Sequence, residues 1–296
     1  MLCQLLSPAR GVHAQSPEVG PQSSDRQKTI GALCPHFRPM ADGRRCGGCR
    51  TMRVLITGGL GWTAAAIIAE LEKAGHQVLL FDLPAAAKIN AHPHRAVLHG
   101  DVADYRAVRA AVGQAEGLVH LAVATGAGAQ DPRTSFRVNV EGTYNLFEAA
   151  RSTGVSRLVA MSEAPVHIDG AGGQEWQSSP GQDHLYDLTK RLQEEIARDF
   201  CATYNMTATV LRPGHIVDGR TGVDPRGRPL TELSYCKGGW ICRHDLARAC
   251  RGALETATTG FSALPVIGAR PGYQRFDVAR TERLLDFRVE CDFAAY

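Results

Sequence analysis

Three side chains in the second half of the sequence have the types and the order of a proton-transfer site. Tyr186 and Lys190 are four residues apart at the start of an amphipathic segment, so on a helix the phenol and the ammonium share one face. The ammonium lowers the pKa of the phenol, which lets a tyrosine accept a proton near neutral pH. Ser162 ends an apolar segment upstream, where its hydroxyl would emerge beside that helix. The pattern predicts a catalytic Ser-Tyr-Lys site, although a Tyr-x-x-x-Lys pair alone also occurs by chance on exposed helices.

A glycine-rich stretch, TGGLGWTA at residues 57–64, separates an apolar strand from an amphipathic helix. Its first glycine permits a tight turn, the later one lets the backbone approach a pyrophosphate, and alanine takes the place of the third small residue. The N-terminus of the following helix directs partial positive charge at the phosphates. The residues predicted to hold a nucleotide here are Gly58, Gly61, Trp62 and Thr63. A purely structural turn is the alternative interpretation.

Asp82 closes the second predicted strand, 24 residues after Gly58. A carboxylate at this place accepts hydrogen bonds from the ribose 2′-hydroxyl of NAD and repels the 2′-phosphate of NADP. The next residues, Leu-Pro-Ala-Ala, supply no arginine for such a phosphate. The sequence therefore predicts NAD as the cofactor. The alternative is an aspartate that only ends a strand in a turn.

The elements that must position these residues alternate between strands and helices from Met52 onward. Apolar segments predict strands at 53–57, 77–81, 96–99, 117–122, 157–162 and 207–212, with amphipathic segments between them. Near-continuous apolar strands separated by helices are typical of a parallel sheet covered on both faces. We predict an α/β fold, in which a Rossmann-like doubly wound parallel sheet at 52–212 is interleaved with a small C-terminal substrate-binding lobe at 213–296. Two further helices are expected in this lobe, near 244–257 and 276–286.

The first 51 residues differ from the rest in composition. They contain seven Arg or Lys and three Asp or Glu residues, are rich in Gly, Pro, Ser and Gln, and show no helical or strand period. This composition predicts a disordered and dispensable extension. A mitochondrial leader is one alternative. Another is a zinc site at Cys34, His36, Cys46 and Cys49, although no folded ribbon surrounds these residues.

The body that follows is close to neutral, with 26 basic and 27 acidic residues. Nucleic-acid binding needs a basic face, and a membrane span needs roughly 20 apolar residues in a row, so neither kind of partner is predicted. Nine scattered cysteines show no disulfide framework. They favour reduced thiols in a cytoplasmic protein, and no metal site is predicted in the body.

Further stretches of the sequence carry a family resemblance; they are HGDV at 99–102, VHLA at 119–122, NVEGT at 139–143 and LRP at 211–213. With the motifs above, the sequence resembles the extended short-chain dehydrogenase/reductase superfamily in its NAD-dependent epimerase/dehydratase branch, well over about residues 52–250 and more loosely beyond. The resemblance implies further cofactor contacts; they are Asp101, Val102, Leu121, Ala122 and Asn139. It also implies that Tyr186 transfers the substrate proton, that Ser162 hydrogen-bonds the same oxygen, and that Lys190 binds the nicotinamide ribose.

Two stretches on the substrate side depart from the family. This sequence has MSEAPVH at 161–167, where the family often has Ser-Ser-x-Ala-Val-Tyr-Gly. After the sixth strand it has HIVDG at 215–219, where the family has Asn-x-Tyr-Gly. Glu163 is either an additional base, as dehydratases of the family require, or a solvated charge. The predicted substrate-binding residues are Ser162, His215 and Arg212. Arg212, or else Arg243, would pair with a substrate carboxylate, while a structural arginine and a hydrogen-bonded loop histidine are the alternatives.

The body from Met52 has 245 residues, which is short for a nucleotide-sugar epimerase of this family and similar to the uronate dehydrogenases. We therefore predict an NAD-dependent oxidoreductase that acts on a sugar or sugar derivative, with a uronate dehydrogenase-like enzyme as the specific hypothesis. One alternative is a nucleotide-sugar epimerase or dehydratase that retains its NAD. Another is a non-catalytic NAD-binding regulator, which would not need all of Ser162, Tyr186 and Lys190. The resemblance also implies a homodimer through the helices at 132–152 and 186–204.

Overall fold

The computed structural model describes residues 51–86, 95, 97–165, 184–256 and 259–296. The predicted N-terminal extension lies almost wholly outside the described residues, and so does the zinc site considered at Cys34, His36, Cys46 and Cys49. The Val166-His167 pair, at which the sequence departs from the family, also lies outside them. The expectations for these positions stay predictions.

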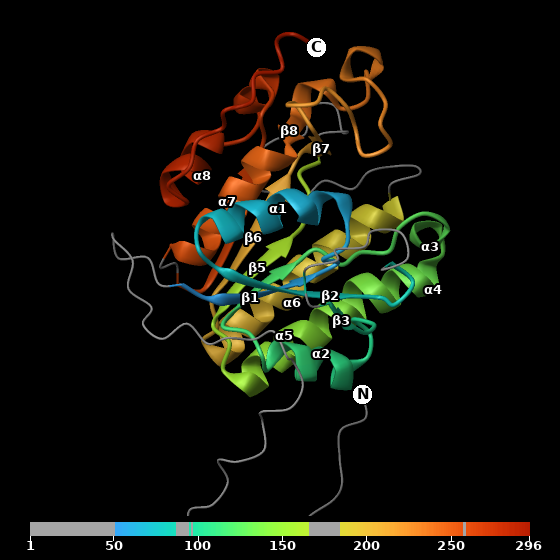
Figure 1. Ribbon diagram of the computed structural model, residues 1–296, viewed down its shortest axis with the longest axis vertical. Helices are drawn as coiled ribbons and strands as arrows, with labels where there is room; N and C mark the ends of the chain where they lie inside the picture. The colour runs from blue at the N-terminus through green and yellow to red at the C-terminus, as the bar shows by residue number, and fades with distance from the viewer. Residues whose placement is uncertain (1–50, 87–94, 96, 166–183, 257–258) are drawn as a thin grey trace, which may run out of the picture. The chain divides into compact units, whose positions relative to one another are not determined.

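A seven-stranded sheet runs through the described residues, with all neighbouring strands parallel. In spatial order its strands are β3 (Val97–His99), β2 (Gln77–Asp82), β1 (Arg53–Thr57), β4 (Gly117–His120), β5 (Arg157–Met161), β6 (Ala208–Pro213) and β9 (Phe261–Val266). The chain winds outward from β1 in one direction through β3 and then in the other through β9 (Figure 1). The predicted doubly wound parallel sheet is confirmed, and β9 adds a strand that the sequence did not reveal.

Helices cover the sheet on both faces (Figure 1). The helices α1 (Trp62–Lys73) and α7 (Arg243–Glu255) pack together on one face, while α2 (Tyr105–Val112), α5 (Gly142–Thr153) and α6 (His184–Tyr204) pack on the other. Two short helices, α3 (Ala127–Gln130) and α4 (Pro132–Ser135), lead into a π-helical turn at Phe136–Glu141 that continues as α5. No helix in the described part of the chain is long and apolar enough to cross a membrane.

The central strands are apolar on both sides because two separate cores flank the sheet. Along β1, Leu55 belongs to the core beneath α2, α5 and α6, whereas Val54 and Ile56 belong to the core beneath α1 and α7. Successive side chains of a strand point to opposite faces, so each strand contributes to both cores. Burying one such leucine or isoleucine stabilises the fold by about 1.5–3 kcal/mol. This packing fixes the carboxyl ends of the strands, where the site residues emerge.

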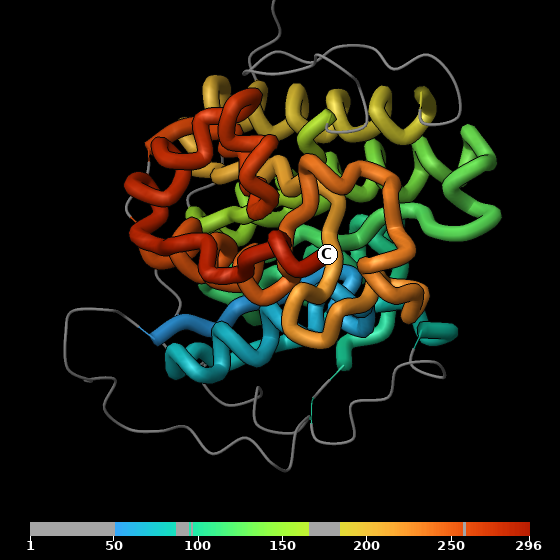
Figure 2. Tube along the Cα trace, turned by 90° about the horizontal axis from the view of Figure 1, so that it is seen from above, coloured from blue at the N-terminus to red at the C-terminus, as the bar shows by residue number. Residues whose placement is uncertain are grey.

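The C-terminal part of the chain forms a lobe above those strand ends. It contains the two parallel strands β7 (His215–Val217) and β8 (Trp240–Cys242), the helix α8 (Val278–Leu284), and the fully buried indole of Trp240, which packs edge-on against Phe293. Viewed from above, its orange and red segments lie between α6 and α1 (Figure 2). The lobe and the sheet belong to one compact unit that spans Arg44–Tyr296. The division at residues 212 and 213 stays a prediction about function.

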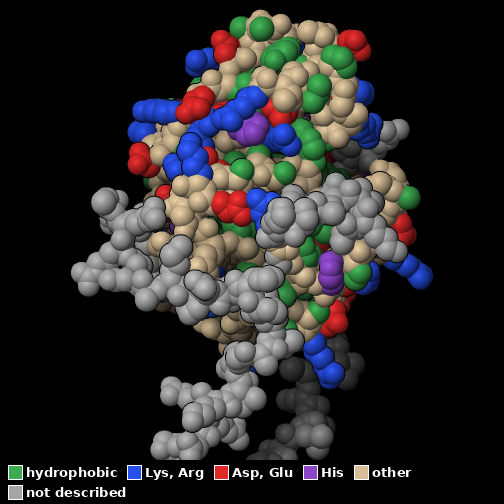
Figure 3. Space-filling model, viewed as in Figure 1, with side chains coloured by type: hydrophobic (Ala, Val, Ile, Leu, Met, Phe, Trp, Pro, Cys, Tyr) green, Lys and Arg blue, Asp and Glu red, His purple; other side chains and the backbone are tan. Residues whose placement is uncertain are grey.

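Charged side chains of both signs alternate over the face seen in Figure 3. Ion pairs also join separate elements, such as Arg251 of α7 with Glu70 of α1 at 3.1 Å, and Arg248 of α7 with Glu290 at 3.0 Å. Partly exposed pairs of this kind contribute about 0–1 kcal/mol each.

Candidate active site

A first cavity, of about 470 Å³, lies along the carboxyl ends of the strands and is built around the predicted glycine turn. The predicted cofactor residues that line it are Gly58, Gly61, Trp62, Thr63, Asp82, Asp101, Val102, Leu121 and Ala122. Gly58 has a φ of +68°, and a Cβ atom there would come within 2.9 Å of the backbone nitrogen of Ala122. A side chain is therefore excluded by both conformation and space. The turn forms a cradle in which backbone, and not side chains, faces the cavity.

The helix α1 starts at Trp62 directly behind this turn. Gly61 occupies its N-cap in an extended conformation and provides no side-chain cap for the first turn. The first backbone N–H groups of a helix have no partner within it, so they and the helix dipole together favour an anion. Trp62 and Thr63 of this first turn both line the cavity. The arrangement fits the pyrophosphate of a dinucleotide.

Asp82 holds its carboxylate at the far side of the same turn. One oxygen accepts a hydrogen bond from the backbone of Leu60 at 2.9 Å, and the other accepts one from Leu83 at 2.8 Å. These bonds fix the group at the end of β2. An adenosine ribose placed along this wall would find a hydrogen-bond acceptor, whereas a 2′-phosphate would meet a negative charge.

We expect Asp82→Asn to narrow the preference for NAD over NADP by roughly fivefold or more, because two like charges about 4 Å apart repel by about 1 kcal/mol even in bulk water. Dissociation constants for the two nucleotides, measured by calorimetry, test this. Asp101→Asn is the matched control, since Asp101 lines the same cavity but is paired with Arg137 at 2.8 Å. An unchanged ratio in Asp82→Asn would contradict the role of the carboxylate.

A second cavity, of about 410 Å³, contains the predicted catalytic residues. Ser162 directly follows β5, and Tyr186 and Lys190 stand one turn apart on α6; all three line this cavity. Four residues, Thr63, Leu121, Val123 and Pro225, line both cavities. A nucleotide in the first cavity would therefore border directly on a molecule in the second.

Lys190 is buried and anchored next to the tyrosine. Its Nζ donates a hydrogen bond to the backbone oxygen of Met161 at 2.8 Å and lies 5.5 Å from the centroid of the Tyr186 ring. Burial lowers the pKa of Lys190 to about 8, while the charges of Glu163 and Glu194 act in the opposite direction. The side chain is therefore mostly protonated at neutral pH and places a positive charge beside the phenol.

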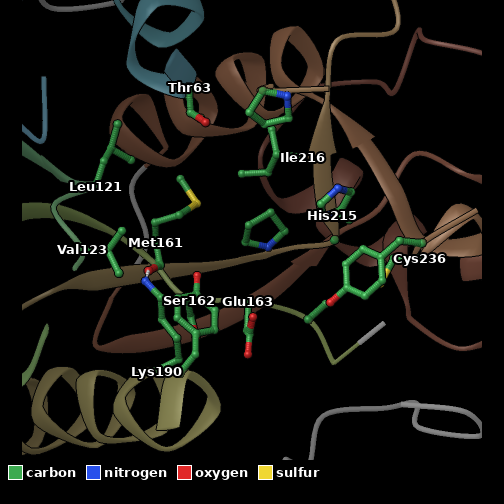
Figure 4. Close-up of a pocket in the computed structure, with 16 residues that line it drawn as sticks. Thr63, Leu121, Val123, Met161, Ser162, Glu163, Lys190, His215, Ile216 and Cys236 are labelled. Carbon is green, nitrogen blue, oxygen red and sulfur yellow. Dashed lines mark hydrogen bonds between the residues drawn. The ribbon is translucent and has the colours of Figure 1, made fainter. Parts of the chain in front are cut away.

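Ser162 and His215 each present a buried polar atom to the second cavity from different walls (Figure 4). Neither the hydroxyl oxygen of Ser162 nor Nε2 of His215 has a hydrogen-bond partner among the described residues. The imidazole packs edge-on against Tyr235, with ring centroids 5.2 Å apart. Burial, as the largest cause, lowers the pKa of His215, so the ring is neutral at pH 7. Buried polar atoms without partners indicate where a ligand is bound.

A family model described as the NAD dependent epimerase/dehydratase family matches residues 54–228 of the chain. The chain belongs to this family. The resemblance stated from the motifs is thereby confirmed, and the family is defined by its NAD cofactor. Among curated proteins the chain is similar to the 3 beta-hydroxysteroid dehydrogenase/Delta 5→4-isomerase of Mycobacterium tuberculosis, with 36% identity over 176 residues that cover 55% of this chain and 47% of that protein. The chain thus spans about half the length of the curated relatives it matches.

Solved structures show the same fold at lower identity. A glucuronic acid dehydrogenase from Chromohalobacter salexigens has 22% identity and a TM-score of 0.64, covering 83% of this chain and 87% of that one. A short-chain dehydrogenase/reductase superfamily protein from Agrobacterium tumefaciens, solved with bound NAD, has 20% identity and a TM-score of 0.65, covering 80% and 92%. These similarities establish the fold.

In this member of the epimerase/dehydratase family, Arg212 is not available to a substrate. Its side chain is only 7% exposed and forms two hydrogen bonds with the carboxylate of Glu194 on α6, at 2.8 and 2.5 Å. It does not line the second cavity. The prediction that Arg212 binds substrate is therefore corrected, because a buried guanidinium needs this carboxylate as its counter-charge.

Arg243, the other arginine considered for a substrate carboxylate, is also engaged. Its Nε lies 2.7 Å from an oxygen of Asp218, and its guanidinium stacks over the Trp62 ring at 4.4 Å from the centroid. The contact ties the start of α7 to the start of α1, beside the phosphate cradle. Arg243 therefore supports the cofactor wall and does not line the second cavity.

Asn139 lies in the π-helical turn and does not line either cavity, which differs from the cofactor contact predicted for it. Its amide oxygen accepts a hydrogen bond from the backbone of Ala124 at 2.8 Å, and its amide nitrogen donates one to Thr189 at 2.9 Å. Thr189 precedes Lys190 on α6. Asn139 thus positions the catalytic helix against the loop that follows β4.

His120, at the end of β4, is a buried histidine whose role the sequence did not reveal. Thr143 donates to a backbone carbonyl and accepts from Gln193 at 2.7 Å, so Nε2 of His120 must donate the remaining bond to Thr143, at 2.9 Å. Nδ1 then accepts a hydrogen bond from Thr57 at 2.7 Å. Burial, as the largest cause, lowers the pKa of His120 to about 3. A signal was present, because a histidine inside the apolar run VHLA has to be satisfied by buried partners.

No group of three or more His, Cys, Asp or Glu side chains is arranged to hold a metal within the described ranges. The described cysteines, such as Cys236 and Cys242, are free thiols.

Proposed function

We propose that the protein is an NAD-dependent oxidoreductase that interconverts a secondary alcohol and a ketone at Ser162, Tyr186 and Lys190. One observation carries this proposal: the three residues line one cavity, and that cavity shares four wall residues with the cavity around the glycine turn. A hydride donor and its acceptor must be adjacent and aligned, and the shared wall provides this adjacency.

Each residue has a distinct part in the proposed reaction. Tyr186 accepts the proton of the substrate hydroxyl at its phenol oxygen as the carbonyl forms, and it returns that proton in the reverse direction. Ser162 hydrogen-bonds the same substrate oxygen with its otherwise unpartnered hydroxyl. Lys190, with one N–H used by Met161, keeps a positive charge beside the phenol. Bound NAD would supply the acceptor for the hydride of the carbinol carbon.

The residues around the first cavity support NAD as the molecule held there. The side-chain-free turn at Gly58, the uncapped start of α1 and the fixed carboxylate of Asp82 match a pyrophosphate and an adenosine ribose in this order. A sugar or sugar derivative is the substrate class that the family resemblance implies. The specific uronate hypothesis loses the support expected from Arg212 and Arg243, since both are paired within the fold.

A second candidate function is epimerisation or dehydration with NAD retained through the cycle. It is favoured by Glu163, which lines the second cavity next to Ser162 and whose charge raises the pKa of Lys190. A dehydratase needs a further base to remove a proton from carbon, and a carboxylate at this place could serve. The two candidates differ in whether reduced cofactor accumulates.

The test incubates the full chain with NAD and a panel of free uronic acids, neutral sugars, nucleotide sugars and other secondary alcohols. Absorbance of reduced cofactor and product masses are followed together. Accumulating NADH supports the oxidoreductase, and a changed substrate without net NADH supports the epimerase or dehydratase. Binding of NAD without any turnover would favour the non-catalytic regulator. The homodimer implied by the family is tested separately by light scattering.

A further inference from the structure

The second cavity contains few charges for its size. Of its 16 lining residues, only Glu163 and Lys190 carry a formal charge, and the other ionisable side chains are the neutral His215, Tyr186, Tyr235 and Cys236. The lysine interacts electrostatically with Glu163 and donates to Met161. A carboxylate or phosphate that entered would meet a carboxylate and no uncompensated cation. Burying an anion without a partner is strongly unfavourable.

Three arginines of the surrounding elements are paired with carboxylates, and Arg275 donates a hydrogen bond to the backbone oxygen of Pro165 at 3.4 Å. Arg212 is bound to Glu194, Arg243 lies against Asp218, and Arg228 is held by Asp224 at 2.7 Å. The sequence between Pro165 and α6 contains no lysine or arginine at all. Arg226 influences His215 only through its charge and does not line the cavity. The described surroundings therefore favour an uncharged ligand.

Much of the lining of the second cavity is apolar. Its leucine, valine, methionine, alanine, proline and isoleucine residues include Leu121, Val123, Met161, Ala164, Pro213 and Ile216. A sugar ring placed among them would leave several hydroxyl groups without hydrogen-bond partners, which lowers affinity. A skeleton that carries few hydroxyl groups would bury apolar surface there instead.

The far wall offers one polar contact. Figure 4 shows His215 separated from Ser162 and Lys190, with Ile216 and Cys236 labelled in the same region. The ring is held against Tyr235, and its buried Nε2 has no partner among the described residues. A neutral imidazole can donate or accept one hydrogen bond. A ligand that spans the cavity would satisfy this nitrogen with a hydroxyl or carbonyl group at its second end.

We propose that the substrate is an uncharged secondary alcohol or ketone on a largely apolar skeleton, with a second neutral hydroxyl or carbonyl group that binds His215. This inference rests on the proposed oxidoreductase function and specifies its substrate class. It excludes uronates and nucleotide sugars as the preferred substrates, because both carry an anionic group that the described walls do not neutralise.

The test uses three matched compounds: a bicyclohexyl diol with one hydroxyl on each ring, the mono-alcohol that lacks the second hydroxyl, and the analogue in which a carboxylate replaces it. Glucuronate and UDP-glucose complete the set. With NAD and the full chain, we expect kcat/KM for the diol to exceed that for the carboxylate analogue by at least about tenfold. The hydrogen bond made by the second hydroxyl should raise kcat/KM for the diol roughly fivefold above that for the mono-alcohol.

Variants of His215 separate recognition from folding. His215→Leu should lower kcat/KM for the diol relative to that for the mono-alcohol, so that the preference for the diol disappears. His215→Gln keeps a hydrogen-bonding group and should retain part of the preference. A general loss of structure would instead lower kcat/KM for both alcohols by the same factor. If His215→Leu preserves the full preference for the diol, the assignment of the second polar group to His215 is wrong.

Calorimetry with the NAD-loaded Tyr186→Phe variant measures binding of the same compounds without turnover, so the two proposals can fail separately. If the diol binds more tightly than the carboxylate analogue, the proposed substrate class is supported. This holds even if the wild-type chain turns over none of the compounds, a result that would contradict the oxidoreductase function. Efficient oxidation of glucuronate or UDP-glucose, better than that of the diol, overturns the substrate class and leaves the oxidoreductase function intact. Absence of diol binding also overturns the substrate class.

Discussion

Tyr186→Phe is expected to lower kcat by at least about a thousandfold while it changes the dissociation constant of NAD by less than roughly threefold. The substitution keeps the ring, and with it the contact with the Lys190 side chain, and removes only the hydroxyl. A positioned acid or base contributes about 10²–10⁴-fold to rate. Absorbance of NADH under saturating substrate measures kcat, and calorimetry measures NAD binding.

Tyr204→Phe is the matched control for this experiment. Tyr204 ends the same helix, α6, is 48% exposed, and lines neither cavity. The same chemical change there should leave kcat within about twofold, because its ring contacts with Phe200 and Arg151 do not need the hydroxyl. Residual activity above a tenth of wild type in Tyr186→Phe would show that the proton passes through another group.

The cofactor side of the site could be predicted because its parts are set by local chain geometry. Gly58 needs a positive φ, and Asp82 sits at the end of the strand paired directly with β1, so spacing along the sequence was sufficient to place both. The placement of Tyr186 and Lys190 along the second cavity was predictable for the same reason, since one helical turn separates the two residues. In each case the physical constraint operates within a strand–turn–helix unit.

The substrate side was less accessible to sequence reasoning because its contacts join distant elements. His215 faces Tyr235 across a loop of the lobe, and Asn139 reaches Thr189 fifty residues later. Neither pairing follows from local periodicity. The position of Glu194 in the sequence did predict a buried ion pair. Glu194 lies four residues after Lys190 and hence on the same buried face of α6, where a carboxylate needs a cationic partner. Arg212 at the end of β6 is that cation.

Arg212→Met is expected to destabilise the protein by about 3–5 kcal/mol, which is the range typical of removing one partner from a buried ion pair. The side chains of Arg212 and Glu194 are only 8% and 2% exposed, so the remaining carboxylate would be left in a poorly hydrated interior. Denaturant titration of the NAD-free protein measures the change in free energy of unfolding. Arg251→Met, which removes the guanidinium of a half-exposed pair with Glu70, is the control and should cost less than about 1 kcal/mol.

The double variant Arg212→Met, Glu194→Met distinguishes a structural arginine from a substrate-binding one. It removes both charges and replaces them with apolar side chains of similar length, so much of the stability lost in Arg212→Met should return. If the ion pair only holds α6 against β6, the restored protein also regains catalysis with an unaltered KM for every substrate. If Arg212 bound a substrate carboxylate, stability would return while KM for an acidic substrate stayed high. The first outcome is expected, because Arg212 faces Glu194 and not the cavity that contains Ser162.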